Sequence, residues 1–394
     1  MKILLLGDYS NVHATLADGL RQLGHTVVVA SDGDSWKGYP RDVDLRRKSL
    51  GLLDSLVYCL RLWGCFRRFR GFDVVQIINP VFLPLKAERI WKYYAQLRRH
   101  NRAVFMGAFG MDHYYVKGCL EGGIFKYSDF MMGDVERRSA DNDTWKQDWL
   151  VGEKGRLNQF VASDCDGIIS GLYEYQACYE KEFPEKLTYI PFPIKEKSDL
   201  PVRDKCDGSR PIRFFVGIQK ARSVYKGTDV MLSALERVKA LYPEHVEIVK
   251  VESVPFDEYQ HLMNNSDVIL DQLYSYTPAM NALEAMSRGL VVVGGGEPEN
   301  YAILGEEKLR PIVNVSPNEN AVFQALKELV ENPERVSDLS AQSREYIHLH
   351  HNHIKVAQRY LDVWDKGQGT RVKRLESRDN RQRTIDKGSR TLYP

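Results

Sequence analysis

The sequence predicts an α/β protein built from two doubly wound domains, and three observations support this fold class. A chain of 394 residues is too long for one ordinary hydrophobic core. Short apolar runs alternate with helical patterns in both halves, as buried parallel strands and their crossover helices do. A polar segment rich in turn residues interrupts this alternation. We therefore expect a Rossmann-like domain at 1–194, a linker at 195–211 and a second Rossmann-like domain at 212–336.

The first half opens with a compact strand–helix–strand unit. Its strands are expected at 2–7 and 26–30 and its helix at 12–23, with Gly24 as the stop. A short unit of this kind is right-handed by default. Further strands of the same sheet are expected at 74–78, 104–106, 167–170 and 188–190.

The second half repeats the pattern after the linker. Thr277 and Pro278 are expected to open a helix, with threonine as N-cap and proline at the first helical position. A long helix at about 337–364 follows the last strand, and a basic polar tail at 367–394 is expected to be disordered. The other expected elements are strands at 212–216, 246–251, 268–271 and 290–293, and helices at 229–241 and 257–264.

Composition excludes several classes of protein. Lys and Arg number 55 against 53 Asp and Glu, so the chain lacks the large excess of positive charge that would indicate a nucleic-acid binder. The apolar run at residues 1–8 is too short for a signal peptide or a membrane span. The six cysteines (59, 65, 119, 165, 178 and 206) form no CxxC pair and no metal spacing, so we expect a reduced, cytoplasmic protein.

Glu284 is an acid in the apolar part of the helix expected after Thr277. That helix begins where one strand ends, and a glycine-rich loop at 294–296 follows the next strand. Ligands of parallel α/β sheets bind beyond the carboxyl ends of the strands, and two such domains form a cleft. A carboxylate there is suited to accept hydrogen bonds from two sugar hydroxyls. The alternative is a carboxylate that faces solvent.

The loop after the first strand of the second domain carries three cations. It begins at Gly217 and contains Lys220, Arg222 and Lys226, with Gly227 directly before a helix. Loop amides, a helix N-terminus and cations together favour anion binding. The alternative is a solvated basic loop.

In this combination the motifs resemble those of retaining GT-B glycosyltransferases of the family-4 type. The resemblance rests on the order of Gly217, Lys226-Gly227, the stretch LEAMSRG around Glu284 and the stretch GGGEPEN, and it covers about residues 1–365. The stretches DQLYSYTPAMNALEAM and GGGEPENY are similar to sugar transferases of bacterial surface-polysaccharide clusters. The resemblance implies a GT-B fold with a C-terminal helical region at 337–366, in which the second domain binds a nucleotide-sugar.

The resemblance also implies roles for single residues. Lys226 corresponds to the lysine that contacts the donor diphosphate, and Glu284 to the acid that binds the ribose hydroxyls. Gly7 corresponds to the glycine turn of the first domain that faces the donor phosphate. Further donor-side positions are Ala279 and Met280, at the loop-to-helix start, and Glu299 in the GGGEPEN stretch.

Two positions depart from the family pattern. The family has a glycine–arginine pair where this chain has Gly217 without the arginine, so Lys220 or Arg222 is expected to supply the partner cation. The glutamate that contacts the donor sugar is replaced by Tyr276. Either Tyr276 or Asn281 takes over sugar recognition, or the donor sugar lies differently.

The loop at 107–115 of the first domain follows a strand and is expected to face the cleft. The family has a histidine or an acid there, close to the donor sugar. Asp112 and His113 are therefore candidate catalytic residues beside Lys226. The alternative for the acid is a loop carboxylate that caps a helix.

No metal and no cofactor are expected. The one plausible acid pair, Asp32 and Asp34, belongs to the first domain rather than the donor domain, so cations are expected to neutralise the diphosphate. Four histidines lie on a helical stretch where they cannot all face one way, and no cysteine or carboxylate cluster accompanies them. They are His348, His350, His351 and His353.

Residues 46–70 combine seven basic residues and one acid with aromatic and aliphatic side chains. This composition suits an interfacial helix on anionic lipid, and a lipid-linked acceptor would give such a helix a purpose. The alternative is a helix packed on its own sheet whose arginines reach outward.

The expected function is retaining transfer of a sugar from a nucleotide-sugar to a hydroxyl of a glycan or lipid-linked glycan, in polysaccharide biosynthesis. The nucleotide-sugar is a substrate, and nucleic acid is not an expected partner. The expected location is the cytoplasm or the inner face of the plasma membrane. The alternatives are a nucleotide-sugar epimerase of the same fold and a catalytically inactive nucleotide-sugar-binding protein, which Tyr276 suggests.

Overall fold

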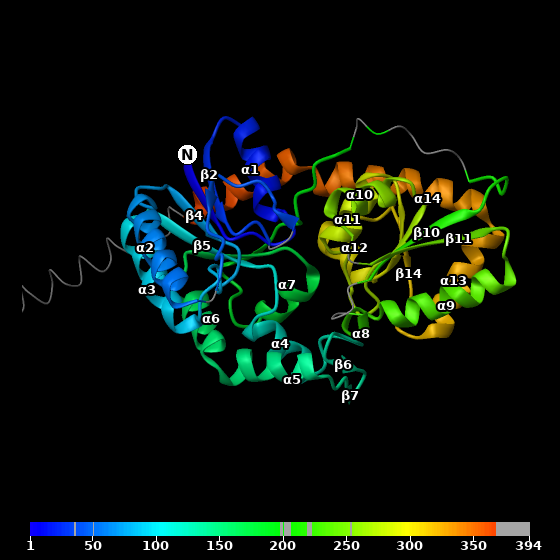
Figure 1. Ribbon diagram of the computed structural model, residues 1–394, viewed down its shortest axis with the longest axis horizontal. Helices are drawn as coiled ribbons and strands as arrows, with labels where there is room; N and C mark the ends of the chain where they lie inside the picture. Colours follow the sequence, from blue (N-terminus) through cyan, green and yellow to red (C-terminus); the bar gives the residue numbers. More distant parts are fainter. Residues whose placement is uncertain are drawn as a thin grey trace, which may run out of the picture.

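Two parallel sheets form the centres of two domains that lie side by side (Figure 1). The computed structural model describes residues 1–34, 37–49, 51–197, 200, 206–218, 223–252 and 254–367. The first domain has a seven-stranded sheet in the order β3-β2-β1-β4-β5-β8-β9, and the second a five-stranded sheet in the order β11-β10-β12-β13-β14. This arrangement confirms the prediction of two Rossmann-like domains.

The strands of the first domain follow the apolar runs of the sequence. Leu4 of β1 pairs with Val28 of β2 on one side and Val75 of β4 on the other, which places β1 in the middle of the sheet. The strands are β1 (Lys2–Leu6), β2 (Thr26–Ser31), β3 (Val43–Asp44), β4 (Val74–Ile77), β5 (Ala103–Ala108), β8 (Gly167–Ser170) and β9 (Leu187–Tyr189). The helices are α1 (Val12–Gln22), α2 (Leu52–Arg68), α3 (Ala87–His100), α4 (His113–Glu121), α5 (Ala140–Lys146), α6 (Glu153–Asp164) and α7 (Tyr173–Tyr179).

The second domain buries both faces of its sheet. Phe214 and Val216 pack in one apolar cluster and Phe215 in the other, which is why the strand reads as a continuous apolar run. Its strands are β10 (Ile212–Ile218), β11 (Val246–Glu252), β12 (Val268–Leu270), β13 (Val291–Gly294) and β14 (Ile312–Asn314). Its helices are α8 (Ser223–Lys226), α9 (Thr228–Leu241), α10 (Phe256–Asn264), α11 (Met280–Ser287), α12 (Pro298–Leu304), α13 (Glu319–Glu331) and α14 (Pro333–Tyr346).

A segment of the first domain reaches toward the second between α4 and α5. It contains the hairpin of β6 (Met131–Met132) and β7 (Val135–Glu136). Figure 1 shows this hairpin below α8, in the gap between the two domains. We refer to residues 123–139 as the arm.

The start of α11 differs from the sequence prediction. The helix begins at Met280, with Ala279 in the N-cap position, so the predicted N-cap Thr277 is wrong. The reason is a contact from the other domain. The Thr277 amide donates a hydrogen bond to Glu174 at 3.1 Å, and the Thr277 hydroxyl donates another to the same carboxylate.

The predicted C-terminal helix is also interrupted. α14 continues through a π-helical turn (Ile347–His351) and stops at Asn352, whose extended backbone forms a bridge with Ile194. A second helix, residues 353–367, then packs on the first domain. The chain therefore crosses between the domains twice, and the two crossings pair with each other. The predicted tail lies outside the described residues except for Gly367.

Trp364 anchors this returning helix. Its side chain is fully buried against Tyr360 and Phe105, and its indole N–H donates to Gln76 at 3.4 Å. Trp364→Ala should lower the free energy of unfolding by about 3–5 kcal/mol, the usual cost of removing a large core aromatic. Chemical denaturation measures this change. The control Trp63→Ala removes an exposed tryptophan and should leave stability nearly unchanged; equal effects of both substitutions would contradict the packing described here.

Candidate functional site

The carboxyl edges of the two sheets face each other, and Glu174 of α7 joins them. Its carboxylate accepts hydrogen bonds from the amides of Tyr276 at 2.8 Å and Thr277 at 3.1 Å, which follow β12 in the second domain. Burial raises the pKa of the Glu174 carboxyl, although these hydrogen bonds oppose the shift. The segment that leads into α11 is therefore positioned by the first domain.

Tyr276 lies in an aromatic cluster at this junction. Its side chain is 1% exposed, and its ring lies 5.8 Å from Tyr173, 5.1 Å from Tyr127 and 5.4 Å from Phe125. Its hydroxyl accepts a hydrogen bond from the Lys126 amide at 2.6 Å. Tyr276 is thus held mainly by residues of the arm and α7.

The arm makes further contacts with the second domain. The Tyr127 hydroxyl donates to Glu297 at 2.7 Å, and Lys126 forms an ion pair with the same carboxylate at 3.4 Å. The Arg137 guanidinium lies 3.3 Å from the centre of the Tyr274 ring. These contacts join the arm to the second domain.

Lys226 is the last residue of α8 and is half-buried beside the arm. Its carbonyl accepts a hydrogen bond from the Leu273 amide at 2.9 Å. Burial raises the pKa of Asp129, although hydrogen bonds from Tyr225 and Tyr115 and the positive charges of Arg137 and Lys226 oppose the shift. The predicted phosphate lysine therefore lies after β10, on a short helix that contacts the arm through Tyr225.

Glu284 lies on α11 with its side chain 29% exposed. Its Oε1 accepts from the buried Arg288 at 2.6 Å and lies 3.4 Å from Lys197 of the chain crossing. Within the described part of the chain, no hydrogen bond or ion pair reaches Oε2. The carboxylate thus balances a buried guanidinium and still has an acceptor oxygen left. The ion pair with Arg288 is by itself enough to explain why an acid lies in an apolar helix, and no bound ligand is needed for that explanation.

The neighbouring positions of α11 are packed. The Asn281 amide donates to Asp271 at 3.0 Å and its carbonyl oxygen accepts from the Tyr259 hydroxyl at 2.9 Å. Met280 is 8% exposed, and Ala279 occupies the N-cap position. Asn281 is therefore held inside its own domain, which disfavours it as the replacement for the missing glutamate.

Gly7 follows β1 with φ of +79°, and a Cβ there would lie 2.4 Å from Ile78. The next residue, Asp8, accepts hydrogen bonds from the amides of His13 at 3.0 Å and Ala14 at 3.2 Å. A carboxylate therefore already occupies the N-terminus of α1, where a phosphate would bind. Burial raises the pKa of Asp8 to about 7.

Asp112 and His113 both have partners in the interior. Asp112 is the N-cap of α4: it accepts from the Tyr115 amide at 2.9 Å and the Tyr179 hydroxyl at 2.8 Å, and burial raises its pKa to about 7. The ring nitrogens of His113 lie 2.8 Å from the Trp149 carbonyl and 2.7 Å from the Gln159 amide. The geometry favours the capping alternative over a catalytic role for Asp112.

The remaining predicted residues divide into two groups. Gly217 lies inside β10, where a Cβ would approach the Tyr259 hydroxyl to 2.9 Å. Glu299 lies in the first turn of α12, and its Oε2 is buried and unpaired among the described residues. Lys220 and Arg222 lie outside the described residues. The structure thus brings Tyr276, Lys226 and Glu284 to one edge, and holds Asp112 and His113 within the first domain.

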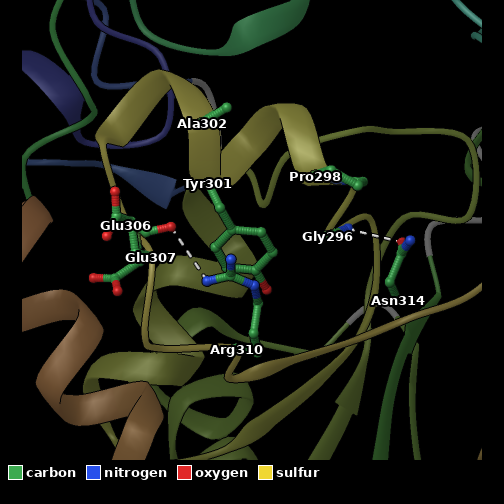
Figure 2. A pocket seen from close by; sticks show the side chains of 8 residues that line it. All are labelled: Gly296, Pro298, Tyr301, Ala302, Glu306, Glu307, Arg310 and Asn314. Carbon is green, nitrogen blue, oxygen red and sulfur yellow. Dashed lines mark hydrogen bonds between the residues drawn. The ribbon is translucent and has the colours of Figure 1, made fainter.

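A hollow in the described part of the chain lies elsewhere. It measures about 460 Å³ and runs beside α12, between Gly296 and Asn314 at one end and Glu306 at the other. Figure 2 shows Arg310 lying across the ring of Tyr301, 4.3 Å from its centre. Glu306 and Arg310 are paired within the protein, and none of the predicted donor residues lines this hollow.

The four C-terminal histidines are distributed over the chain crossings. His348 lies 3.2 Å from Glu196 and His350 lies 2.6 Å from Glu306, whose pKa is lowered to about 2 by hydrogen bonds from His350 and two backbone amides that outweigh burial. His351 and His353 contact the Phe192 carbonyl and Gln22. In the ranges that the structure describes, no cluster of His, Cys, Asp and Glu has the arrangement of a metal site.

Sequence reasoning missed the arm, Glu174 and Lys197. Glu174 comes shortly after a strand of the first domain, as Asp112 does. The rule that singled out Asp112, a polar residue beyond the carboxyl end of a strand, would also have found Glu174. The arm has no regular period in its sequence, and its importance depends on contacts with residues more than a hundred positions away.

Comparison with known proteins shows similarity in structure only. No family model and no curated protein matches the chain. HepE from Anabaena, solved with UDP and glucose, matches over 93% of this chain and 100% of its own, with a TM-score of 0.56 and 12% identity. Sucrose-phosphate synthase from Thermosynechococcus elongatus matches over 93% and 99%, with a TM-score of 0.58 and 13% identity.

A third match is WaaG, a glycosyltransferase involved in lipopolysaccharide biosynthesis, over 91% of this chain and 98% of its own, with a TM-score of 0.51 and 13% identity. The chain has the GT-B fold. At identities of 12 and 13% the likeness extends to the fold alone.

The buried Asp112 carboxyl should make stability depend on pH. Its pKa rises from 3.8 to about 7 on folding, so between these values the folded state binds more protons than the unfolded state. The free energy of unfolding should therefore fall as pH rises through this window, by up to about 1.4 kcal/mol per pH unit for one proton.

Asp112→Asn keeps a capping oxygen and removes the proton, so it should flatten this dependence. Urea denaturation of wild type and variant across the window measures the difference, and the contribution of Asp8 cancels because both proteins contain it. Parallel pH profiles of wild type and variant would contradict the assignment.

Proposed function

We propose that this protein is a glycosyltransferase that moves a sugar from a nucleotide-sugar donor to a hydroxyl of a glycan or lipid-linked glycan. The GT-B fold supports the proposal, because HepE, sucrose-phosphate synthase and WaaG share it, and HepE was solved with UDP and with UDP-glucose. The reaction is proposed to retain the configuration of the sugar and to need no metal ion.

The observation that carries the proposal is the position of Glu284. It lies on the helix that follows β12, at the cleft edge, with Oε2 unpaired among the described residues and the side chain partly exposed. A ribose offers two hydroxyl donors to such an acceptor, and charge-assisted hydrogen bonds of this kind contribute about 1.5–3 kcal/mol each. Arg288 and Lys197 hold the carboxylate in position.

Lys226 is the proposed diphosphate contact. In the transfer, the bond between the sugar C1 and the diphosphate oxygen breaks, and its electron pair stays on the diphosphate. A lysine ammonium beside that oxygen stabilises the growing negative charge. The charge of Lys226 also opposes the upward pKa shift that burial causes in Asp129.

The acceptor hydroxyl is proposed to attack C1 from the face that the diphosphate leaves. Its oxygen forms the new bond to C1, and its proton passes to the departing diphosphate. This course needs no protein nucleophile. It agrees with the interior hydrogen bonds of Asp112 and His113, which leave neither residue placed to attack C1.

Tyr276 favours a second candidate function, a protein that binds a nucleotide-sugar without transferring it. The family has a sugar-binding glutamate at this position, and here a tyrosine is buried between the domains. A transferase then has to recognise the sugar with other residues. A protein that only binds the nucleotide-sugar does not need to hold the sugar in a position for transfer.

The first test is Glu284→Gln. The glutamine keeps an oxygen for Arg288 and loses the charge, so the fold should persist with a small loss of stability. Affinity for the nucleotide should fall by about tenfold or more, since 1.4 kcal/mol corresponds to a factor of ten. Isothermal titration calorimetry measures the affinity and thermal melting the stability.

The matched control is Glu236→Gln, which changes an exposed glutamate on α9 of the same domain. It should leave nucleotide affinity unaltered. If Glu284→Gln lowers the melting temperature but binds nucleotide as the wild type does, the carboxylate serves Arg288 alone and the ribose assignment fails.

The second test concerns metal ions. Because lysine and arginine side chains are proposed to neutralise the diphosphate, transfer should continue in EDTA. An assay of sugar release from donor to acceptor, with and without the chelator, measures this. Complete loss of turnover in EDTA that Mn²⁺ or Mg²⁺ restores would contradict the proposed chemistry.

A panel of UDP-, GDP- and dTDP-sugars separates the candidate functions. Melting shifts identify the donor, since a ligand at a hundred times its dissociation constant stabilises a protein by about 2.7 kcal/mol. Donor turnover only with an acceptor supports a transferase, turnover without an acceptor supports an epimerase, and binding without turnover supports the second candidate. No shift with any nucleotide-sugar would contradict all three.

A further inference from the structure

Helix α2 has two apolar faces on opposite sides. The inner face packs on the first domain through Tyr58, Leu62 and Phe66, which are at most 4% exposed. The outer face consists of five large apolar side chains that point away from the domain. They are Leu53, Leu56, Val57, Leu60 and Trp63, with exposed fractions of 81, 60, 64, 61 and 57%.

These five residues form one continuous row, which we call the outer stripe. Their spacing of three, four, seven and ten residues from Leu53 places them on one side of an α-helix. The other exposed large apolar residues in the described chain are distributed over several elements. An apolar surface of this kind marks an interaction site rather than ordinary exposure.

Cations flank the outer stripe at both ends. Arg46 and Lys48 are exposed before the helix, and Arg68 and Arg70 are exposed at its end. Arg67 lies over the ring of Trp63, 4.7 Å from its centre. The one acid in this segment is Asp54. The surface is therefore apolar along its length and strongly positive around it.

The position of α2 leaves this surface free to meet a large flat partner. Figure 1 shows α2 at the outer side of the first domain, away from the second domain. Among the described residues, the contacts that join the two domains come from Tyr39, the arm, α5, α7 and the chain crossings, and α2 takes no part in them. A partner on the outer stripe would thus leave the cleft open.

We propose that the outer stripe docks on the surface of an anionic lipid bilayer. The helix would lie parallel to the surface, with leucine, valine and tryptophan side chains among the upper acyl chains and the flanking cations among anionic headgroups. Exposed tryptophan and arginine beside an aliphatic row are suited to this interface. A protein partner would need a groove matched to the row, whereas a bilayer needs only the apolar side and the charge.

The proposed contact is peripheral. Throughout the described ranges, no helix has both the length and the apolar character needed to cross a membrane. The proposal goes beyond the transferase reaction and does not depend on it, because α2 lies at the outer side of the first domain, away from α8 and α11 (Figure 1).

Flotation with lipid vesicles tests the proposal on the full chain. At low salt the wild type should float with vesicles of phosphatidylglycerol and phosphatidylcholine, and much less with phosphatidylcholine alone. The double variant Leu56→Ser/Leu60→Ser removes the middle of the stripe from exposed positions, so folding should be unaffected. Its vesicle affinity should fall by about tenfold or more, since two buried leucines contribute well over the 1.4 kcal/mol that a factor of ten requires.

Two further variants separate the physical contributions. Leu241→Ser makes the same change at a leucine that is 59% exposed on the second domain, and it should bind vesicles as the wild type does. Arg68→Glu/Arg70→Glu should weaken binding to anionic vesicles and reduce its dependence on salt.

Three outcomes would overturn the proposal. The wild type fails to float with anionic vesicles at low salt. The stripe variant floats as well as the Leu241→Ser control does. Analytical ultracentrifugation without lipid finds a wild-type dimer that the stripe variant dissociates, which would assign the stripe to a second copy of the chain. The stripe variant should bind the nucleotide with the same affinity as the wild type. The vesicle experiments therefore test the membrane proposal independently of the transferase proposal.

Discussion

The buried carboxylate of Glu174 is the contact on which the arrangement of the two domains depends. It accepts hydrogen bonds from two amides and a hydroxyl of the segment that joins β12 to α11. A buried anion is stable only where such donors surround it, so the contact is specific for this one arrangement of the domains. The aromatic cluster around Tyr276 and the Tyr127–Glu297 hydrogen bond form beside it.

The same contact explains why a tyrosine suits position 276. With the segment held by Glu174, the side chain of Tyr276 points into the first domain and fills the space between the arm and α7. A glutamate there would place a second carboxylate near Glu174 and Glu297 without the ring contacts. Tyr276 therefore serves the domain junction, and the proposed sugar recognition has to come from other residues.

The local sequence predicted most helices and strands, but it did not predict helix ends that depend on contacts with residues far away in the chain. The strands were predictable because runs such as Phe214–Val216 are buried on both faces, which only apolar residues tolerate. The start of α11 depends on Glu174, which lies 103 residues before Thr277, and the break at Asn352 depends on Ile194. At the site, sequence predicted an acid at Glu284 and a lysine at Lys226 on one edge, but the ion pair with the buried Arg288 and the contact of α8 with the arm follow only from the fold.

The central claim is that the donor binds at the edge of the second domain, between Lys226 and Glu284. Hydrogen–deuterium exchange tests it most directly, with the nucleotide-sugar that raises the melting temperature most. The account predicts slower amide exchange in α11 and at the junction of α8 and α9 when that ligand is bound, with the segment after β12 also protected. Protection confined to the hollow beside α12, or no protection in α11, would contradict it.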